Sequence, residues 1–299
     1  MPVSSLPRLI IAVLGLIVGL GLFCGLVLWL IDQPVAWGAH WQNISFMGCV
    51  GVFVLTFPLM AWGARKWAVL ADLMHGAAGA EPRRGYFLRH YTWQSWIGQF
   101  IPPSLAIILG RGVVVRQMGG DLRARDGFWS AFWDQGLEFA VLVGMMPASA
   151  LLLWGGEAGD LFWFLLAAGI FLVLPACYLF FFIFQKKILG RFYALFFLSV
   201  GRVFWLTLRL VVGSLALGLP FDSSLIVAAV PLVSCLSLLP FVPGNLGLAE
   251  WGWVGVMALG GADPALVAYY AIAFRLMSLL SQTILVAICE YKYSYRSSL

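Results

Sequence analysis

Charged side chains are missing from long stretches of this chain, and that absence limits what the chain can fold into. Of its 299 residues, 62% are hydrophobic and 10% are charged. Several apolar runs reach about 20 residues, which at about 1.5 Å per residue spans the roughly 30 Å hydrocarbon core of a bilayer. The sequence therefore predicts an all-α integral membrane protein. So apolar a chain leaves no room for a separate soluble domain, and we expect a single membrane domain over residues 1–299.

Six apolar runs are long enough to form full transmembrane helices. They cover residues 9–31, 44–62, 127–154, 161–184, 193–219 and 265–289. Two further apolar segments, 91–118 and 223–260, are each interrupted by proline, which removes a backbone donor and clashes with the preceding helical turn. Each is therefore predicted to form a re-entrant helical hairpin with arms of about 16–18 Å. The hairpins would turn at Pro102 and Pro103, and at Pro243, Gly244 and Gly247.

Basic residues mark one side of the predicted membrane domain. With two re-entrant hairpins, all but three of the 18 Lys and Arg residues lie on that side, and the opposite loops carry only acidic charges. This bias predicts a multi-pass protein of the inner (plasma) membrane with both termini in the cytoplasm. The order of elements predicts an inverted-topology repeat, with a first half over about 1–156 and a second over about 157–299. Eight conventional crossings are the alternative.

Four charged residues within the predicted spans form the centre of the candidate site. Charged side chains inside a membrane are costly and usually face a partner or a cavity. Asp134 and Glu138 lie four residues apart and so share one helix face. Glu138 and Arg202 lie at matching depths of about 14–16 Å, so we expect them to pair. Arg209 follows on roughly the same face as Arg202, and deeper. These charges would either lock helices together or line a polar cavity.

Three more charged residues lie beside the predicted hairpins or near the middle of a span. Glu250 opens the second arm of the later hairpin, where the free N–H groups of a helix's first turn favour a carboxylate. Arg275 lies near the midplane of the last span, where we expect it to pair with Glu250. Arg111 follows the first proline bend. Its rigid fork of donors suits a phosphate, although its long side chain could instead reach the inner headgroups.

A resemblance to a known family rests on these same segments. Residues 240–250 read Pro-Phe-Val-Pro-Gly-Asn-Leu-Gly-Leu-Ala-Glu, which is similar to the P-x-x-P-G-G-L-G-x-x-E signature of the lysylphosphatidylglycerol synthase transmembrane-domain family. Residues 273–276, Ala-Phe-Arg-Leu, resemble the family's following helix, and residues 102–111 with 134–138 resemble its first proline segment and acidic helix. The chain departs from the family at Asn245, where Gly is usual, and in the first segment, which lacks the usual Gly-Gly and acidic residue.

The resemblance implies a flippase-like membrane protein. In well-understood members this domain moves aminoacylated phosphatidylglycerol between leaflets, with a cytosolic synthase domain fused behind it. The chain printed here ends at Leu299 without such a domain, so we expect a stand-alone member that does not charge lipids with amino acids.

The leading functional hypothesis is therefore a translocator that moves a charged-headgroup lipid between leaflets, and not an enzyme. The lipid would be a phospholipid, with or without an aminoacyl group, or a lipid-linked precursor. We expect membrane lipids as partners, a separate lipid-synthesis enzyme and a homo-oligomer as further candidates, and no nucleic acid, cofactor or metal. Two alternatives stay open. One is a non-catalytic scaffold for a lipid or glycan assembly system. The other is an intramembrane lipid-modifying enzyme with Asp134 and Glu138 as acid and base or as metal ligands.

Overall fold

The described part of the chain is helical throughout and contains no strand. The computed structural model describes residues 6–33, 42–75, 84–101, 106–108, 110–111, 124–154, 159–184, 189, 191–237 and 245–297. The helices are α1 (Leu6–Ile31), α3 (Phe46–His75), α4 (Arg84–Ile97), α6 (Ala124–Leu153), α7 (Asp160–Phe184), α9 (Phe192–Ala216), α10 (Ser223–Ser237), α11 (Leu248–Leu259) and α12 (Pro264–Ser297). The prediction of an all-α protein is confirmed for these residues.

Five helices in the described ranges are long and apolar enough to cross a membrane. They are Phe46–Leu73 in α3, Trp129–Leu153 in α6, Asp160–Leu179 in α7, Phe192–Ala216 in α9 and Pro264–Lys292 in α12. Each coincides with one of the predicted spans, so the chain is a multi-pass membrane protein. The remaining predicted span, 9–31, falls on α1, a helix of 26 residues that includes the apolar stretch Ile17–Ile31.

Helix α3 is longer than the sequence predicted. We expected its span to end near residue 62 and a polar connection to follow, but the helix continues to His75. The reason is a second apolar cluster, in which Trp67 and Ala71 pack with Phe87 of α4. The rings of Trp67 and Phe87 meet edge to face at 5.0 Å between centroids. This packing carries Lys66 into the interior of the bundle, where we had expected a residue of an inner loop.

Three helices are too short to cross a bilayer. With 14, 15 and 12 residues, α4, α10 and α11 rise about 21, 22 and 18 Å, against a hydrocarbon core of about 30 Å. The predicted turn residues Pro102, Pro103, Pro243 and Gly244 lie outside the described residues. The fifth, Gly247, is described and precedes α11 directly, with a φ of 76°.

Gly247 is placed where no other residue fits. A Cβ on this residue would lie 2.6 Å from the backbone nitrogen of Phe23 and 2.9 Å from the carbonyl oxygen of Gly19, both on α1. The positive φ adds a second penalty for any larger residue. Trp251 strengthens the same contact, because its Nε1 donates to the Leu22 carbonyl oxygen at 2.9 Å. Helix α1 is therefore packed directly on the start of α11.

Helix α10 begins with a side-chain cap. The backbone N–H and the hydroxyl of Ser224 both donate to the Asp222 carboxylate, at 3.0 and 2.6 Å. These hydrogen bonds hold the pKa of Asp222 below its usual value, and the one from the hydroxyl has the larger effect. Asp222 is one of the acidic loop residues that the sequence places opposite the basic side.

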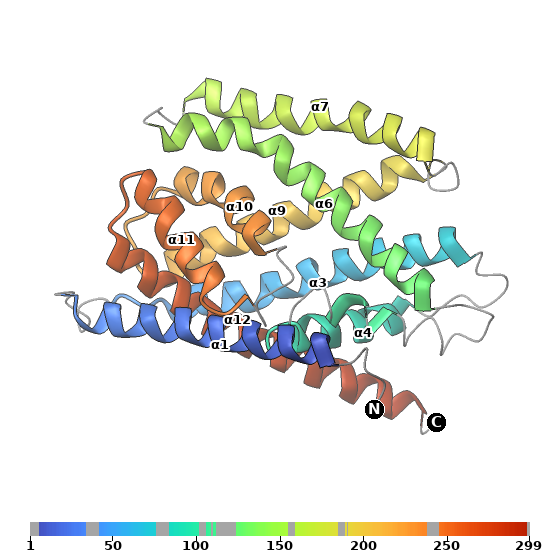
Figure 1. The fold of residues 1–299 in the computed structure, drawn as a ribbon, viewed down its shortest axis with the longest axis horizontal. Helices are drawn as coiled ribbons and strands as arrows, with labels where there is room; N and C mark the ends of the chain where they lie inside the picture. Colours follow the sequence, from blue (N-terminus) through green and yellow to red (C-terminus); the bar gives the residue numbers. More distant parts are fainter. Residues whose placement is uncertain are drawn as a thin grey trace.

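The long helices run roughly side by side along the longest axis of the molecule (Figure 1). Helix α3 packs along α9, and α6 packs along α7. The start of α1 and the end of α12 lie at the same end of the bundle, together with the end of α3 and the start of α6 (Figure 1). Helix α4 lies toward that end, whereas α10 and α11 lie toward the opposite one. The short helices therefore occupy opposite ends of the bundle.

The contact between α6 and α7 supplies a direct test of this packing. The two backbones meet at Gly144 and Gly169, where a Cβ on Gly144 would lie 2.7 Å from the Gly169 carbonyl oxygen and a Cβ on Gly169 would overlap the Gly144 carbonyl oxygen. We expect Gly169→Ala to lower the free energy of unfolding by about 1–3 kcal/mol, since an overpacked contact must open. Denaturing-detergent titration of the purified protein measures this change.

Gly136→Ala on α6 is the matched control. A Cβ there meets nothing within 4 Å among the described residues, and alanine is the better helix former. We expect this variant to be at least as stable as the unsubstituted protein. Equal losses in the two variants would contradict the close approach of α6 and α7.

Candidate functional site

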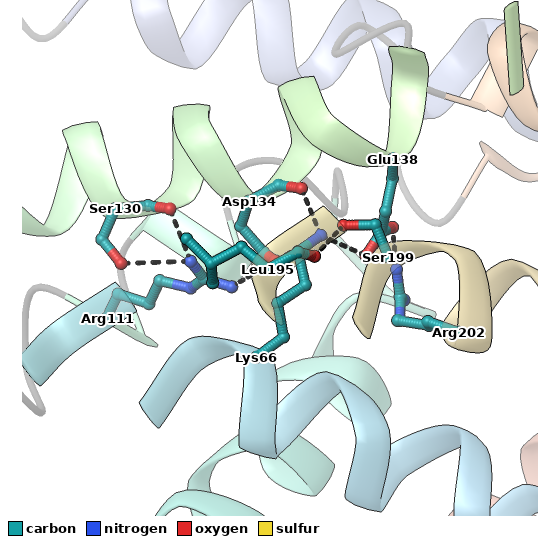
Figure 2. A network of polar contacts seen from close by, with 8 residues as sticks. All are labelled: Lys66, Arg111, Ser130, Asp134, Glu138, Leu195, Ser199 and Arg202. Carbon is teal, nitrogen blue, oxygen red and sulfur yellow. Dashed lines mark hydrogen bonds and ion pairs between the residues drawn. The ribbon is translucent and has the colours of Figure 1, made fainter. Parts of the chain in front are cut away.

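Five charged side chains meet in the interior of the bundle in alternating order. They are Arg111, Asp134, Lys66, Glu138 and Arg202, and we call them the charge ladder (Figure 2). Four of the five were candidate site residues from the sequence. The cations come from three separate parts of the chain and converge on one face of α6 (Figure 2).

Helix α6 supplies both carboxylates of the ladder. Asp134 and Glu138 are four residues apart, so they project from the same face one turn from each other. Asp134 is buried, and the Glu138 side chain is 14% exposed. Two carboxylates this close in an apolar bundle would repel each other and lose hydration unless cations were bound between and beside them. That requirement is met by the three basic residues.

Lys66 is the central cation and is completely buried. Its Nζ donates to Glu138 Oε1 at 2.9 Å and to the main-chain oxygen of Asp134 at 2.6 Å, and it lies 2.8 Å from Asp134 Oδ1. Two of the three N–H donors of the ammonium thus have hydrogen-bond acceptors, and the Asp134 carboxylate adds an ion pair. Lys66 therefore joins the two carboxylates and fastens α3 to α6.

Arg111 closes one end of the ladder. It pairs with Asp134 Oδ2, and its Nη1 donates to the main-chain oxygen and the hydroxyl of Ser130 at 2.7 and 3.2 Å. Its guanidinium lies over the Trp67 ring, 5.2 Å from the centroid. The side chain is fully buried. Its alternative role, reaching out to inner headgroups, does not fit this position.

Arg202 forms the opposite end, and this end is partly open. It pairs with Glu138 Oε2, as we expected from their matching depths, and lies over the Tyr91 ring of α4 at 5.8 Å. Its side chain is 28% exposed, against none for Lys66 or Arg111. Among the five ladder residues, Arg202 is therefore the one that an approaching group reaches first.

The ladder carries an excess of positive charge. Among the described residues, three cations face two carboxylates, which leaves one formal positive charge unbalanced. A buried charge that no opposite charge balances lowers stability, whereas equal numbers of cations and carboxylates would avoid that cost. The excess favours an anionic ligand at this position.

Hydrogen-bond donors around the ladder are also left unused. Buried side-chain N–H groups without a partner among the described residues belong to Trp62, Trp67, Gln94, Arg111 and Arg202. Trp62 lies against Gly201, and Gln94 lies against Gly110, so each is next to a ladder arginine. Buried polar groups are nearly always satisfied in proteins, so a cluster of unused donors indicates a place for an acceptor. A phosphate supplies such acceptors, and so does ordered water.

The second pair expected from the sequence is also present. Glu250 Oε1 pairs with Arg275, and the two side chains are 3% and 18% exposed. Glu250 lies in the first turn of α11, where the free backbone N–H groups favour its charge. Its other oxygen, Oε2, is buried and has no hydrogen-bond partner among the described residues. This pair fastens α11 to α12.

Arg209 is separate from the ladder. It follows Arg202 by seven residues on α9, but its Nη2 donates to the Ser278 hydroxyl of α12 at 2.9 Å. Its guanidinium lies over the Phe274 ring at 5.1 Å. Arg202 faces α6 and α4 instead, so the two arginines reach different neighbours.

Lys66 was not predicted as a site residue, because the sequence placed it in a connection on the inner side. A signal was present, because Trp67, Leu70 and Ala71 recur at helical spacing directly after it and are all buried. The pairing of Glu290 with Arg89 and Trp93, which fastens α12 to α4, was also not predicted. Arg89 Nε and Nη2 each donate to this carboxylate at 2.7 Å.

An apolar hollow of about 340 Å³ lies between α7 and α9, lined among others by Trp163, Phe171 and Phe196. It is not continuous with the ladder. Val200 lines the hollow, and Arg202 two residues later points to the other side of α9, since successive helical residues turn by about 100°. Two of its lining residues, Phe171 and Phe197, are exposed, so the hollow opens to the outside of the bundle.

The donor set of the ladder does not resemble a metal centre. Within the described ranges, no three His, Cys, Asp or Glu side chains gather as a metal site requires. Asp134 and Glu138 already bind cations, so neither is positioned as a metal ligand or as a free acid or base. Comparison with protein-family models, curated proteins and solved structures finds no match to this chain.

The charge count of the ladder generates a prediction about stability. Asp134→Asn would leave three cations with a single carboxylate, so we expect it to cost about 3–5 kcal/mol of unfolding free energy. Lys66→Met would leave two arginines paired with two carboxylates, so we expect a loss of no more than about 1–2 kcal/mol, the scale of a lost hydrogen bond. Both are measured by denaturing-detergent titration.

The double variant provides the control for this comparison. Combining Lys66→Met with Asp134→Asn restores the excess of one positive charge and should recover part of the loss caused by Asp134→Asn alone. A Lys66→Met variant as unstable as Asp134→Asn would show that contacts, and not charge balance, determine the stability of the ladder.

Proposed function

We propose that this protein is a lipid translocator, which binds the anionic headgroup of a membrane lipid at the charge ladder and moves it between leaflets. The observation that carries the proposal is the buried ladder with one excess positive charge and unused N–H donors around Arg111 and Arg202. A phosphate-bearing headgroup would balance that charge and accept those hydrogen bonds. Its acyl chains would stay in the bilayer.

The arrangement of the helices supports a transporter architecture. In this proposal α1, α3, α6, α7, α9 and α12 cross the membrane, α4 begins a re-entrant hairpin, and α10 with α11 forms another from the opposite side. Support comes from the short helices at opposite ends of the bundle and from the common end of α1 and α12 (Figure 1). The two halves, about 1–156 and 157–299, would form an inverted repeat that rocks around the site. Both termini would be cytoplasmic, in the inner (plasma) membrane.

The resemblance to the lysylphosphatidylglycerol synthase transmembrane-domain family agrees with this function. The signature-like stretch ends at Glu250, whose pairing with Arg275 joins the hairpin to the last helix. A translocator of this kind would take a phospholipid, with or without an aminoacyl group, or a lipid-linked precursor. It would work with a separate enzyme that makes the lipid.

A non-catalytic scaffold is the second candidate, and one observation favours it. Each ladder carboxylate is already bonded to two cations, as in a structural lock between helices. The scaffold reading explains the pairs, but it does not explain the excess positive charge or the unused donors. Neutralising Glu138 and Arg202 together separates the two functions, because a scaffold would tolerate the loss of one charge of each sign and a translocator would not.

The proposal is tested by lipid flipping in reconstituted vesicles. The probe is phosphatidylglycerol with a fluorescent label, bleached from outside by a reductant that does not cross the membrane. We expect the unsubstituted protein to accelerate flipping and Arg202→Gln to slow it about 10- to 100-fold, since a hydrogen bond to a charged group contributes about 1.5–3 kcal/mol.

Arg191→Gln is the matched control, because Arg191 precedes the same helix but forms an exposed pair with Asp72 at 2.8 Å. It should flip lipid at the unsubstituted rate. Glu138→Gln combined with Arg202→Gln removes one charge of each sign, so this double variant should retain the fold yet lose flipping. Vesicles in which neither phosphatidylglycerol nor its aminoacylated form moves faster than in protein-free vesicles would overturn the proposal.

Glu250 is the candidate proton carrier of this mechanism. Its Oε1 faces Arg275, and its buried Oε2 has no hydrogen-bond partner among the described residues. We expect Glu250→Gln to retain lipid binding but to remove the dependence of the flipping rate on pH. The flipping assay, repeated between pH 5 and pH 9, measures this. An unchanged pH dependence in Glu250→Gln would assign proton coupling to another group.

A further inference from the structure

Arg209 is a buried cation that the charge ladder does not use. Arg209 is 3% exposed, and it lies on α9 in the middle of an apolar core that includes Leu210 and Tyr270. Among the described residues, no carboxylate forms an ion pair with it. Arginine keeps its charge under all ordinary conditions, so this charge needs a partner that the described chain does not supply.

The contacts of Arg209 leave donors available. Nη2 donates to the Ser278 hydroxyl, and Nε is buried with no hydrogen-bond partner among the described residues. The Phe274 ring covers one face of the guanidinium. Gly213, one helical turn further along α9, leaves room for that ring, since a Cβ there would lie within 2.6 Å of it. The arrangement resembles an oxyanion site, with a fork of donors, a hydroxyl and an aromatic cover.

The neighbourhood adds to the positive charge. Ser278, which Arg209 contacts, lies three residues after Arg275 on α12, so Arg275 projects from a neighbouring position on the same helix. Arg275 is itself paired with Glu250. Arg209 therefore adds a positive charge and an unused Nε donor beside a stretch of α12 that already carries a paired arginine.

We propose that Arg209, with Ser278, binds a phosphate-type oxyanion as a second station for the headgroup that Arg202 binds first. This inference rests on the proposed function. Seven residues separate the two arginines, so the stations lie about 10 Å apart along α9. Arg209 is nearer the end of α9 at Ala216, and Arg202 is nearer its start at Phe192. A headgroup would pass from one station to the next while α9 stays in place.

The test uses the purified full chain in detergent and isothermal titration calorimetry. The probes are dihexanoyl phosphatidylglycerol, inorganic phosphate, and dihexanoyl glycerol as the uncharged match. The variants are Arg209→Gln, Ser278→Ala and Arg202→Gln, with Arg191→Gln as control. We expect the unsubstituted protein and the control to bind the short-chain phosphatidylglycerol at two sites. Arg209→Gln should lose one site and Arg202→Gln the other, and Ser278→Ala should weaken one site about tenfold.

A second measurement does not depend on ligand affinity. If Arg209 is an uncompensated charge awaiting a ligand, Arg209→Gln should melt at a higher temperature than the unsubstituted protein without added anion, and should gain less when the lipid is added. An arginine with only a packing role would give a lower melting temperature in both conditions.

The outcomes separate this inference from the proposed function. Binding of inorganic phosphate at the Arg209 station supports a free-anion source, and binding of the lipid alone supports a headgroup. Loss of a site in Arg202→Gln, with Arg209→Gln unchanged in affinity and less stable, would overturn the second station and leave the proposed function standing. Absence of binding of either anionic probe to the unsubstituted protein would overturn both.

Discussion

The burial of two carboxylates on one face of α6 is the constraint on which the rest of the bundle depends. Asp134 and Glu138 lie where lipid and apolar side chains exclude water, and an ionised carboxylate there is stable only beside cations. Lys66 and Arg202 bring α3 and α9 to that face, and Arg111 brings the chain beyond α4. In a membrane, apolar packing alone gives helices little reason to choose one neighbour over another. The ladder therefore fastens α3 and α9 to α6, whereas α7 packs on α6 through the close approach of Gly144 and Gly169.

Much of this could be predicted from the sequence. Five of the predicted spans coincide with helices long enough to cross, and the pairs of Glu138 with Arg202 and Glu250 with Arg275 are present, because depth along a helix follows from residue number. Lys66 was misplaced because the end of α3 depends on packing against α4, which the sequence of α3 does not contain. Arg209 was expected beside Arg202, but which neighbour a helix face meets depends on tilt and rotation, which are set by the other helices.

The ladder is uneven along its length, and this unevenness separates structural from functional roles. Arg111 and Lys66 are fully buried, and Lys66 contacts both ladder carboxylates, as suits a structural link between helices. Arg202 is partly exposed, shares its carboxylate with Lys66 and has a buried Nε with no partner among the described residues. A ligand at Arg202 could draw on this donor without breaking the contacts that hold α3 to α6. Stability and binding can therefore coexist in one cluster.

The excess charge is the strongest reason to look beyond a structural role. A lock between helices is most stable when cations and carboxylates are equal in number, and a buried surplus charge costs stability without adding a contact. The ladder has one such surplus, and Arg209, which forms no ion pair with a carboxylate among the described residues, is another. Proteins break the rules of stable packing mainly at functional sites, where the cost is offset when a ligand binds. Two surplus cations about 10 Å apart on one helix therefore fit a path for an anion better than two unrelated packing faults.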